Sequence, residues 1–335
     1  MKTSMPATTP WRWLRALAAG IAVLCALPAT AQDKMQLQLN WFHLADHSPI
    51  YLAMKKGYYK EENIELTVLR GSGSADSAKK IDLGQADVGI SDAPTVLTAI
   101  SKGANLKMVA VVYDKAGNNV FFKKSANIKT PKDLAGKRIA VTQVGSSFHY
   151  SLGLLADKYG FKLSEVKVLP LQSLSNAAAA LKGETVDAAL LPVSTARALM
   201  DSNGAKLLGW VGDETPWQLG AVFASTKTVA DKALVTKVLA ALVRADREYH
   251  DVILTSIAND KVPINDKTKP LLEIIAKYTN LPVEKVVGNS AYIDPDGKLD
   301  VKNVDNQIKW LQEQGFVDKG FAADAIVAKD YVKAD

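Results

Sequence analysis

Short apolar runs alternate along the chain with polar or glycine-rich loops and with segments of helical spacing. In the first third, apolar runs at 35–41, 65–70, 87–91 and 106–113 predict strands, and the stretches 49–56, 75–83 and the one after Pro94 predict helices. Gly57 stands where a left-handed residue would close the first helix. Strands that alternate with helices favour parallel sheets in a doubly wound α/β lobe.

The same pattern recurs further along the chain. Strands are predicted at 138–142, 166–170 and 187–191, with helices at 148–158 and from 175 onward. The stretches 81–91 and 181–191 match in layout, since each joins a helix end, a glycine, an acidic strand start and an apolar strand. The unit occurs only twice, so we expect two similar α/β lobes and not a solenoid.

The last third is predominantly helical. The segments 229–257, 268–279 and 301–314 have apolar spacing near 3.6 and no partner strands, so they should pack on the first lobe. The chain would then cross between lobes twice, near 122–130 and 205–225, and the two crossovers would form a hinge. The expected limits are 32–124 with 223–335 for lobe 1, and 125–222 for lobe 2.

Residues 1–31 have the layout of a secretory signal peptide. A cationic stretch ends at Arg15, an apolar run spans 16–27, and Ala29-Thr-Ala31 forms an A-x-A cleavage site. The run is shorter than the roughly 20 residues that span a bilayer. We therefore expect cleavage near Ala31 and export to the periplasm; an uncleaved signal anchor is the alternative.

Composition narrows the function classes. The chain is 48% hydrophobic and 23% charged, as in ordinary globular proteins. Three of its 41 cationic residues precede the expected cleavage site, where no acid occurs, so the remainder carries only +3. That bias does not favour nucleic-acid binding. The only cysteine, Cys25, lies in the predicted signal peptide, so no disulfide or thiolate site is expected in the exported chain.

The loops that follow the predicted strands carry the candidate binding residues. Ligands of open parallel sheets lie beyond the carboxyl ends of the strands, where helices begin. These loops are rich in neutral hydrogen-bonding groups and poor in acid–base pairs, which favours holding a ligand over transforming it. We expect no catalytic residue, cofactor or metal, and a ligand site formed by Trp41, His47, Ser72, Ser91, Asp92, Gln143, Ser146, Ser147, His149 and Ser194.

Several of these residues admit two interpretations. Ser146 and Ser147 precede an apolar helix whose free N–H groups would favour an anion, although Ser147 could also be an ordinary N-cap. Trp41 could stack on a ligand or close the core of its lobe. Asp92 could recognise an amine or cap the next helix, and His47 could donate to ligand or be satisfied within its loop.

A metal-peptidase interpretation of the first loop is weak. His43-Leu-Ala-Asp46-His47 approaches the H-x-x-E-H zinc pattern, but Asp46 replaces the glutamate and the segment directly follows a strand. The chain also lacks a phosphate-binding P-loop, a G-x-G-x-x-G helix start and a G-x-S-x-G nucleophile elbow.

Two stretches resemble type II periplasmic solute-binding proteins of the aliphatic sulfonate, taurine, nitrate and thiamine-pyrimidine-precursor branch. They are 41–66, with Trp41, His47 and Lys56-Gly-Tyr-Tyr59, and 134–150, with Gly145-Ser-Ser-Phe-His-Tyr150. Asn63 stands where glycine is usual, and asparagine also tolerates positive φ. One departure is Leu191-Pro-Val-Ser194, where sulfonate-binding members often carry an aromatic-rich stretch.

The resemblance implies two lobes, joined by two crossovers, that deliver a small solute to the membrane permease of an ABC importer. It favours a monomeric receptor for a small, sulfonate-like organic anion held by Ser146, Ser147 and Trp41. The alternative ligand is a pyrimidine or other aromatic stacked on Trp41. Some relatives are cytosolic pyrimidine synthases with a cysteine-rich motif, which this chain lacks, so an enzyme is the alternative of another class; a sensor without an importer is a third.

Overall fold

The computed structural model describes residues 31–113, 115, 118–259, 261–288 and 291–331. The predicted signal peptide, apart from Ala31, lies outside these residues. The chain divides into two compact units, 1–32 and 33–335, and the fold below is that of the second unit. Within the described residues, every helix is too short or too polar to cross a membrane.

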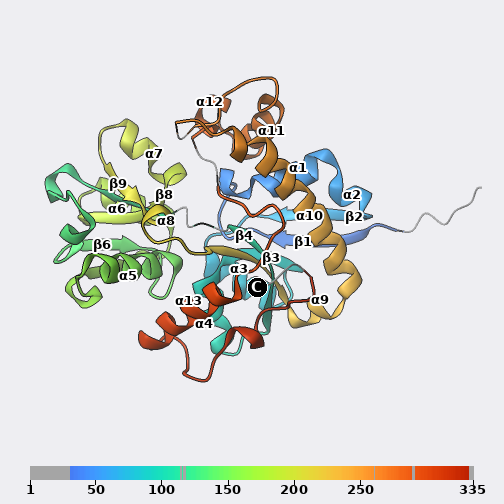
Figure 1. Ribbon diagram of the computed structural model, residues 1–335, viewed down its shortest axis with the longest axis horizontal. Coiled ribbons are helices and arrows are strands. Elements are labelled where there is room, and N and C mark those ends of the chain that lie inside the picture. The colour runs from blue at the N-terminus through green and yellow to red at the C-terminus, as the bar shows by residue number, and fades with distance from the viewer. Residues whose placement is uncertain (1–30, 114, 116–117, 260, 289–290, 332–335) are drawn as a thin grey trace, which may run out of the picture. The chain divides into compact units, whose positions relative to one another are not determined.

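The first sheet has five strands in the order β2-β1-β3-β10-β4 (Figure 1). Strand β1 pairs in parallel with β2 and β3, whereas β10 pairs antiparallel with both β3 and β4. The strands span β1 Asp33–Gln38, β2 Ile64–Leu69, β3 Val88–Asp92, β4 Leu106–Tyr113 and β10 Gly220–Ser225.

The second sheet repeats this arrangement in the order β7-β6-β8-β5-β9. Strand β6 pairs in parallel with β7 and β8, and β5 pairs antiparallel with β8 and β9. Its strands span β5 Asn118–Phe122, β6 Arg138–Val141, β7 Lys167–Pro170, β8 Ala188–Pro192 and β9 Lys206–Trp210. The expected pair of similar α/β lobes is thus present, and each sheet is mixed and not purely parallel.

The antiparallel strands move the first crossover from its expected place. The chain leaves the first sheet after β4, at Tyr113, and enters the second sheet at Asn118, ahead of the expected 122–130. It returns between β9 and β10, within the expected 205–225. The difference arises because β5 and β10 were not recognised as strands: each is a short apolar run that pairs with a strand far away in sequence, a feature that local periodicity does not encode.

Helices cover both faces of the first sheet (Figure 1). One hydrophobic cluster joins Val222 and Ala224 of β10 to α1, α2 and α10, and a second joins Ala221 and Phe223 of β10 to α3, α4 and α13. This division follows the two-residue period of a strand. These helices span α1 Ser48–Lys56, α2 Tyr58–Glu61, α3 Ser74–Asp82, α4 Ala93–Ser101, α10 Lys232–Val252 and α13 Val301–Glu313.

The C-terminal helices pack on the first lobe, as the sequence predicts. Helix α10 contacts α1 and α2, α11 contacts α1, and α13 contacts α4. The expected single helix at 229–257 is divided at Asp231, which caps α10 by accepting from the Leu234 amide. The other helices of this part are α9 Thr226–Ala230, α11 Lys269–Thr279 and α12 Val283–Val286.

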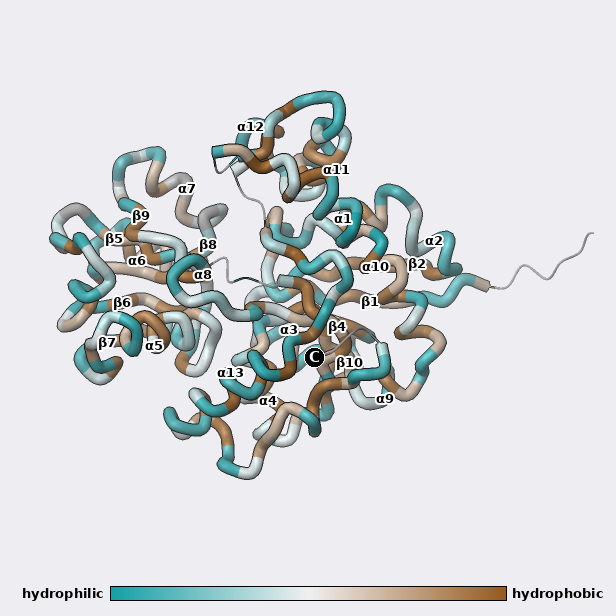
Figure 2. The backbone as a smooth tube through the Cα atoms, viewed as in Figure 1, coloured by the Kyte–Doolittle hydropathy of each residue, from teal (hydrophilic) through white to brown (hydrophobic). Residues whose placement is uncertain are grey.

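The second sheet has one hydrophobic core, which Figure 2 shows as brown tube along its strands. Its helices are α5 Ser147–Tyr159, α6 Leu174–Lys182, α7 Val193–Asp201 and α8 Val211–Glu214. Trp41 and Leu44, which follow β1 of the first sheet, belong to this second core. The two lobes therefore share apolar contacts near the ends of their strands.

Candidate functional site

A small cavity lies where the ends of strands from both sheets meet. It is lined from the first lobe by residues that follow β1, by the ends of β3 and β4 and by the second crossover, and from the second lobe by the start of α5 and the end of β8. Its volume is about 40 Å³. The lining residues are Asn40, Trp41, Leu44, Asp46, His47, Asp92, Tyr113, Ser147, Phe148, Pro192 and Leu219.

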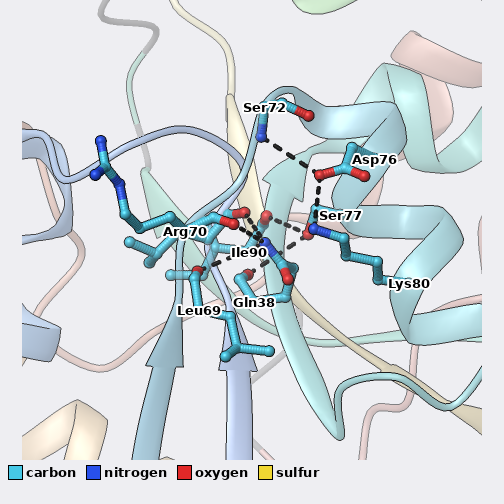
Figure 3. Close-up of polar contacts among 9 residues, drawn as sticks. Gln38, Leu69, Arg70, Ser72, Asp76, Ser77, Lys80 and Ile90 are labelled. Carbon is cyan, nitrogen blue, oxygen red and sulfur yellow. Dashed lines mark hydrogen bonds and ion pairs between the residues drawn. The ribbon is translucent and has the colours of Figure 1, made fainter.

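A buried glutamine fixes the loops beside this cavity (Figure 3). The Gln38 amide nitrogen donates to the carbonyl oxygens of Leu39 at 2.9 Å and Arg70 at 3.0 Å, joining the ends of β1 and β2. The Ser77 hydroxyl on α3 donates to the Ile90 carbonyl of β3 at 3.0 Å. Because backbone carbonyls in a dry interior need donors, these side chains set the positions of the strand ends.

His47 is held by its own loop. Its Nδ1 accepts from the Leu44 amide at 3.3 Å, so its proton lies on Nε2, which donates to the Asn40 side-chain oxygen at 2.9 Å. Burial lowers the pKa of His47 to about 3. The imidazole is therefore neutral at pH 7, and its one N–H donates to Asn40.

Asp92 joins the two lobes through one carboxylate oxygen. Its Oδ1 accepts from the Thr95 amide at 3.0 Å, capping α4, and from the Ser147 amide at 3.2 Å, at the start of α5 in the other lobe. The side chain is only 6% exposed. Burial raises the pKa of Asp92, opposed by hydrogen bonds from Ser74, Thr95 and Ser147. The positive end of α5, expected to hold an anionic ligand, is thus already in contact with a carboxylate of the protein.

Tyr113 reaches the cavity because its neighbour on β10 has no side chain. A Cβ atom at Gly220 would lie 2.4 Å from Cδ2 of Tyr113, so only glycine lets the ring lie there. Tyr113 is 5% exposed, and its hydroxyl has no hydrogen-bond partner among the described residues. A buried, unsatisfied hydroxyl is costly, which makes it a group that a ligand could satisfy.

Trp41 belongs to the core of the second lobe, as one of its two interpretations predicts, and its stacking on a ligand stays a prediction. It is 9% exposed and packs in the core of the second lobe, and it also lines the cavity. Its carbonyl accepts from the Gly71 amide at 3.0 Å, which holds the loop after β2 against it.

The charge of the lining is acidic. Desolvation raises the pKa of Asp46 to about 6, so at pH 7 most of this carboxyl is ionised. Among the lining residues in the described part of the chain, Asp46 and Asp92 are the acidic side chains and His47 is a neutral imidazole. None of these lining residues is Lys or Arg. The cavity therefore offers a ligand carboxylates, hydroxyls and amides.

Four predicted residues line the cavity: Trp41, His47, Asp92 and Ser147. Three others, Ser72, Ser91 and Ser194, do not line it. The Ser91 hydroxyl donates to the Ser74 carbonyl at 3.0 Å, and exposed Ser72 donates its amide to Asp76 at 3.4 Å (Figure 3). Ser194 lies two residues beyond Pro192, and its buried hydroxyl has no partner within the described residues.

The other three support the start of α5. Ser146 is the N-cap: its hydroxyl accepts from the His149 amide at 3.5 Å and donates to the Gln143 carbonyl at 2.7 Å. Gln143 itself lines a separate open groove between the lobes. His149 accepts from the Gly145 amide at 3.1 Å through Nδ1, and burial lowers its pKa to about 4. The N-cap predicted at Ser147 is therefore wrong by one residue: Ser146 is the cap, and Ser147 is the first residue of α5.

Seven lining residues are not among the predicted ligand contacts. Asp46 had been considered only as part of a weak zinc pattern, and Asn40 and Tyr113 stand at strand ends, which was their one available signal. The remaining four are apolar residues that periodicity assigns to a core, namely Leu44, Phe148, Pro192 and Leu219. In the described part of the chain, histidine, cysteine, aspartate and glutamate side chains do not gather in threes at any place suited to a metal ion.

Comparison with known proteins assigns the family. Residues 44–250, more than half of the chain, match the family described as NMT1/THI5 like, and the chain belongs to that family. It is 26% identical over 125 residues to a putative thiamine biosynthesis protein of Haemophilus influenzae, covering 37% of this chain and 40% of the relative. It is 30% identical over 131 residues to a 4-amino-5-hydroxymethyl-2-methylpyrimidine phosphate synthase of Saccharomyces cerevisiae, covering 39% and 38%. The matches thus span about two fifths of these relatives.

Solved structures share the whole fold. The alkanesulfonate-binding protein SsuA from Xanthomonas axonopodis pv. citri, bound to MOPS, matches with a TM-score of 0.74 at 21% identity, covering 89% of this chain and 99% of that protein. The periplasmic nitrate-binding protein NrtA from Synechocystis PCC 6803 matches with a TM-score of 0.71 at 13% identity, covering 90% and 87%. The fold is therefore that of the periplasmic binding proteins, as the sequence resemblance implied.

Proposed function

We propose that the chain is a periplasmic receptor that captures a small solute between its two lobes and presents it to the permease of an ABC importer. The observation that carries the proposal is the cavity lined by both lobes, in which Asp92 of one lobe accepts from the Ser147 amide of the other. The fold shared with alkanesulfonate- and nitrate-binding proteins supports it. Export through the predicted signal peptide, cleaved near Ala31, belongs to the same proposal.

Closure of the two lobes would signal to the permease that a ligand is bound. A ligand in this cavity touches both lobes only when they are closed, so binding shifts the population towards the closed form. The two crossovers, between β4 and β5 and between β9 and β10, are the connections that such a hinge requires. The permease would distinguish the closed form from the open one.

Two ligand classes follow from the sequence. A sulfonate-like anion would use the α5 start at Ser146 and Ser147, and a pyrimidine or other aromatic would use Trp41. The relatives named as pyrimidine phosphate synthases and the position of Trp41 on the cavity wall support the second. The proposed contacts are Trp41, Asp92 and Ser147, with His47 orienting the Asn40 amide.

The test is calorimetric titration with nitrate, methanesulfonate, taurine, 4-aminopyrimidine and 4-amino-5-hydroxymethyl-2-methylpyrimidine, followed by small-angle scattering with the tightest ligand. We expect binding with a decrease in the radius of gyration and recovery of the ligand unchanged. Trp41→Phe should weaken an aromatic ligand more than an inorganic one. Turnover of the ligand, or modification of a histidine in the protein, would instead support a synthase on this fold.

A further inference from the structure

We infer that Asp92 selects the ligand, and that the solute presents a cationic or N–H-donating nitrogen group to this carboxylate: an amine, an amidine, a guanidine or an aminated heteroaromatic ring. The inference rests on the proposed function, since it names the ligand class of the same cavity. It concerns the recognised group and not the whole solute.

The first support is the state of the α5 start. An oxyanion bound there would need the amide of Ser147, and that amide already donates to Oδ1 of Asp92 at 3.2 Å. The same oxygen accepts from Thr95, so the amides at the beginnings of α4 and α5 converge on one protein carboxylate. An incoming anion would have to displace this contact and then lie beside the freed carboxylate, which like charge opposes.

The second support is the charge around the cavity. Asp46 and Asp92 both line it, His47 is neutral, and the described lining contains no Lys or Arg. A ligand that leaves water for this enclosed site meets two carboxyl groups and no positive side chain. The site therefore favours a cation or an N–H donor over an anion. The backbone amides of Thr95 and Ser147 both donate to Oδ1 of Asp92, and the Ser74 hydroxyl also hydrogen-bonds to this carboxyl group.

The third support is the remaining polar group of the wall. Tyr113 is more than nine-tenths buried, lines the cavity, and has a hydroxyl without a partner among the described residues. Its oxygen accepts as readily as it donates. The Tyr113 hydroxyl and the Asp92 carboxylate thus provide two hydrogen-bond acceptors, one neutral and one charged. Trp41 adds an aromatic surface, and the combination suits a flat cation or an aminated ring.

The internal repeat shows that the fold does not itself require an acid at this place. Asp92 is the last residue of β3, and Pro192 is the last residue of β8 in the matching unit of the other lobe. Both line the cavity, and both precede a helix. The charge therefore belongs to the site and not to the strand–helix connection as such.

The test uses pairs of probes matched in size and opposite in charge. Guanidinium and nitrate are both small planar ions, and 4-aminopyrimidine and methanesulfonate represent the larger classes. Each probe is titrated into the full chain, and binding is measured by calorimetry or by ligand-observed NMR at millimolar concentration. Guanidinium and 4-aminopyrimidine should bind, and the two anions should bind at least tenfold more weakly.

Asp92→Asn is the decisive variant, because asparagine also caps helices and keeps the shape of the side chain. The substitution should weaken the affinity for guanidinium and for 4-aminopyrimidine by about tenfold or more, as expected for a lost hydrogen bond to a charged group. Asp300→Asn is the matched control: Asp300 caps α13 in the same way, accepting from the Asn303 amide at 2.9 Å, and lies outside the cavity lining. It should leave both affinities unchanged.

Three results would overturn the inference. One is tighter binding of nitrate or methanesulfonate than of the nitrogen probes; a second is an Asp92→Asn protein that keeps its affinity for those probes; the third is no binding of either nitrogen probe. The first would leave the receptor function intact with another ligand class. Binding of 4-aminopyrimidine accompanied by its chemical conversion would support the inference and overturn the receptor function.

Discussion

Gly153 of α5 lies directly against the indole of Trp310 on α13. A Cβ atom at position 153 would be 2.6 Å from Cζ2 of that ring, so the absence of a side chain permits the contact between a helix of the second lobe and a helix that packs on the first. Tyr150, one turn earlier on α5, stacks edge-on against Trp310 and Trp217, with ring centroids 5.2 Å and 4.8 Å apart. The lobes are thus joined by an aromatic cluster as well as by Asp92.

Gly153→Ala should destabilise the protein, against the trend of helix propensity. In a helix interior, alanine stabilises the helix by about 1 kcal/mol relative to glycine. Overpacking a filled core costs about 1–3 kcal/mol, and Trp310 is too buried to move freely, so the steric effect should prevail. Urea unfolding measures the difference. Gly209→Ala on β9, where a Cβ meets nothing within 4 Å, is the control and should be neutral or slightly stabilising. A Gly153→Ala protein at least as stable as wild type would contradict the contact.

Ser147→Pro should weaken the connection between the lobes while leaving α5 intact. Ser147 is the first helical residue of α5, a position that accepts proline, and the change removes the N–H that donates to Asp92. Loss of a donor to a buried carboxylate should lower the free energy of unfolding by about 1–3 kcal/mol. Ser147→Ala keeps the N–H and should cost much less. If the two variants were equally stable, the hydrogen bond from the Ser147 amide to Asp92 would not contribute to stability.

Gln38→Leu should destabilise the first lobe because it leaves the buried carbonyl oxygen of Leu39 and the partly buried one of Arg70 without their donor. The expected loss is about 2 kcal/mol. Gln36, two residues earlier on the same strand, is exposed, and Gln36→Leu should change stability by less than about 0.5 kcal/mol. Hydrogen exchange at Gly71, which donates to Trp41, reports whether the loop loosens; unchanged protection and stability in Gln38→Leu would argue against the network.

His149 should make the folded state less stable as the pH falls. Its pKa is lowered to about 4 from 6.5 by burial, so between these values the unfolded chain binds a proton that the folded chain does not. The contribution is complete above the unfolded pKa and decreases below it. The stability of wild type relative to His149→Gln should therefore fall by about 2 kcal/mol between pH 8 and pH 5. A pH-independent difference, or an NMR titration of His149 near pH 6.5, would show that this imidazole is not buried neutral.

The sequence determined the local structure of this protein. The strand at 106–113 has the predicted limits, Gly57 ends α1 with φ of 82°, and Asn63 takes positive φ. These features depend on residues within one or two turns of each other, and their periodicity and capping chemistry are written in consecutive positions. The two-lobe arrangement also followed, since the repeat of strands and helices is a local pattern that occurs twice.

Only the tertiary structure decided the content of the cavity. Asp92 and the Ser147 amide are 55 residues apart, and their contact turns an expected anion site into an acidic one. Tyr113 lines the cavity only because Gly220, on a strand that the sequence did not reveal, pairs with it antiparallel. The physical reason is common to both: which groups meet across two sheets depends on long-range pairing and packing, and one-dimensional patterns of apolar and polar residues do not contain that information.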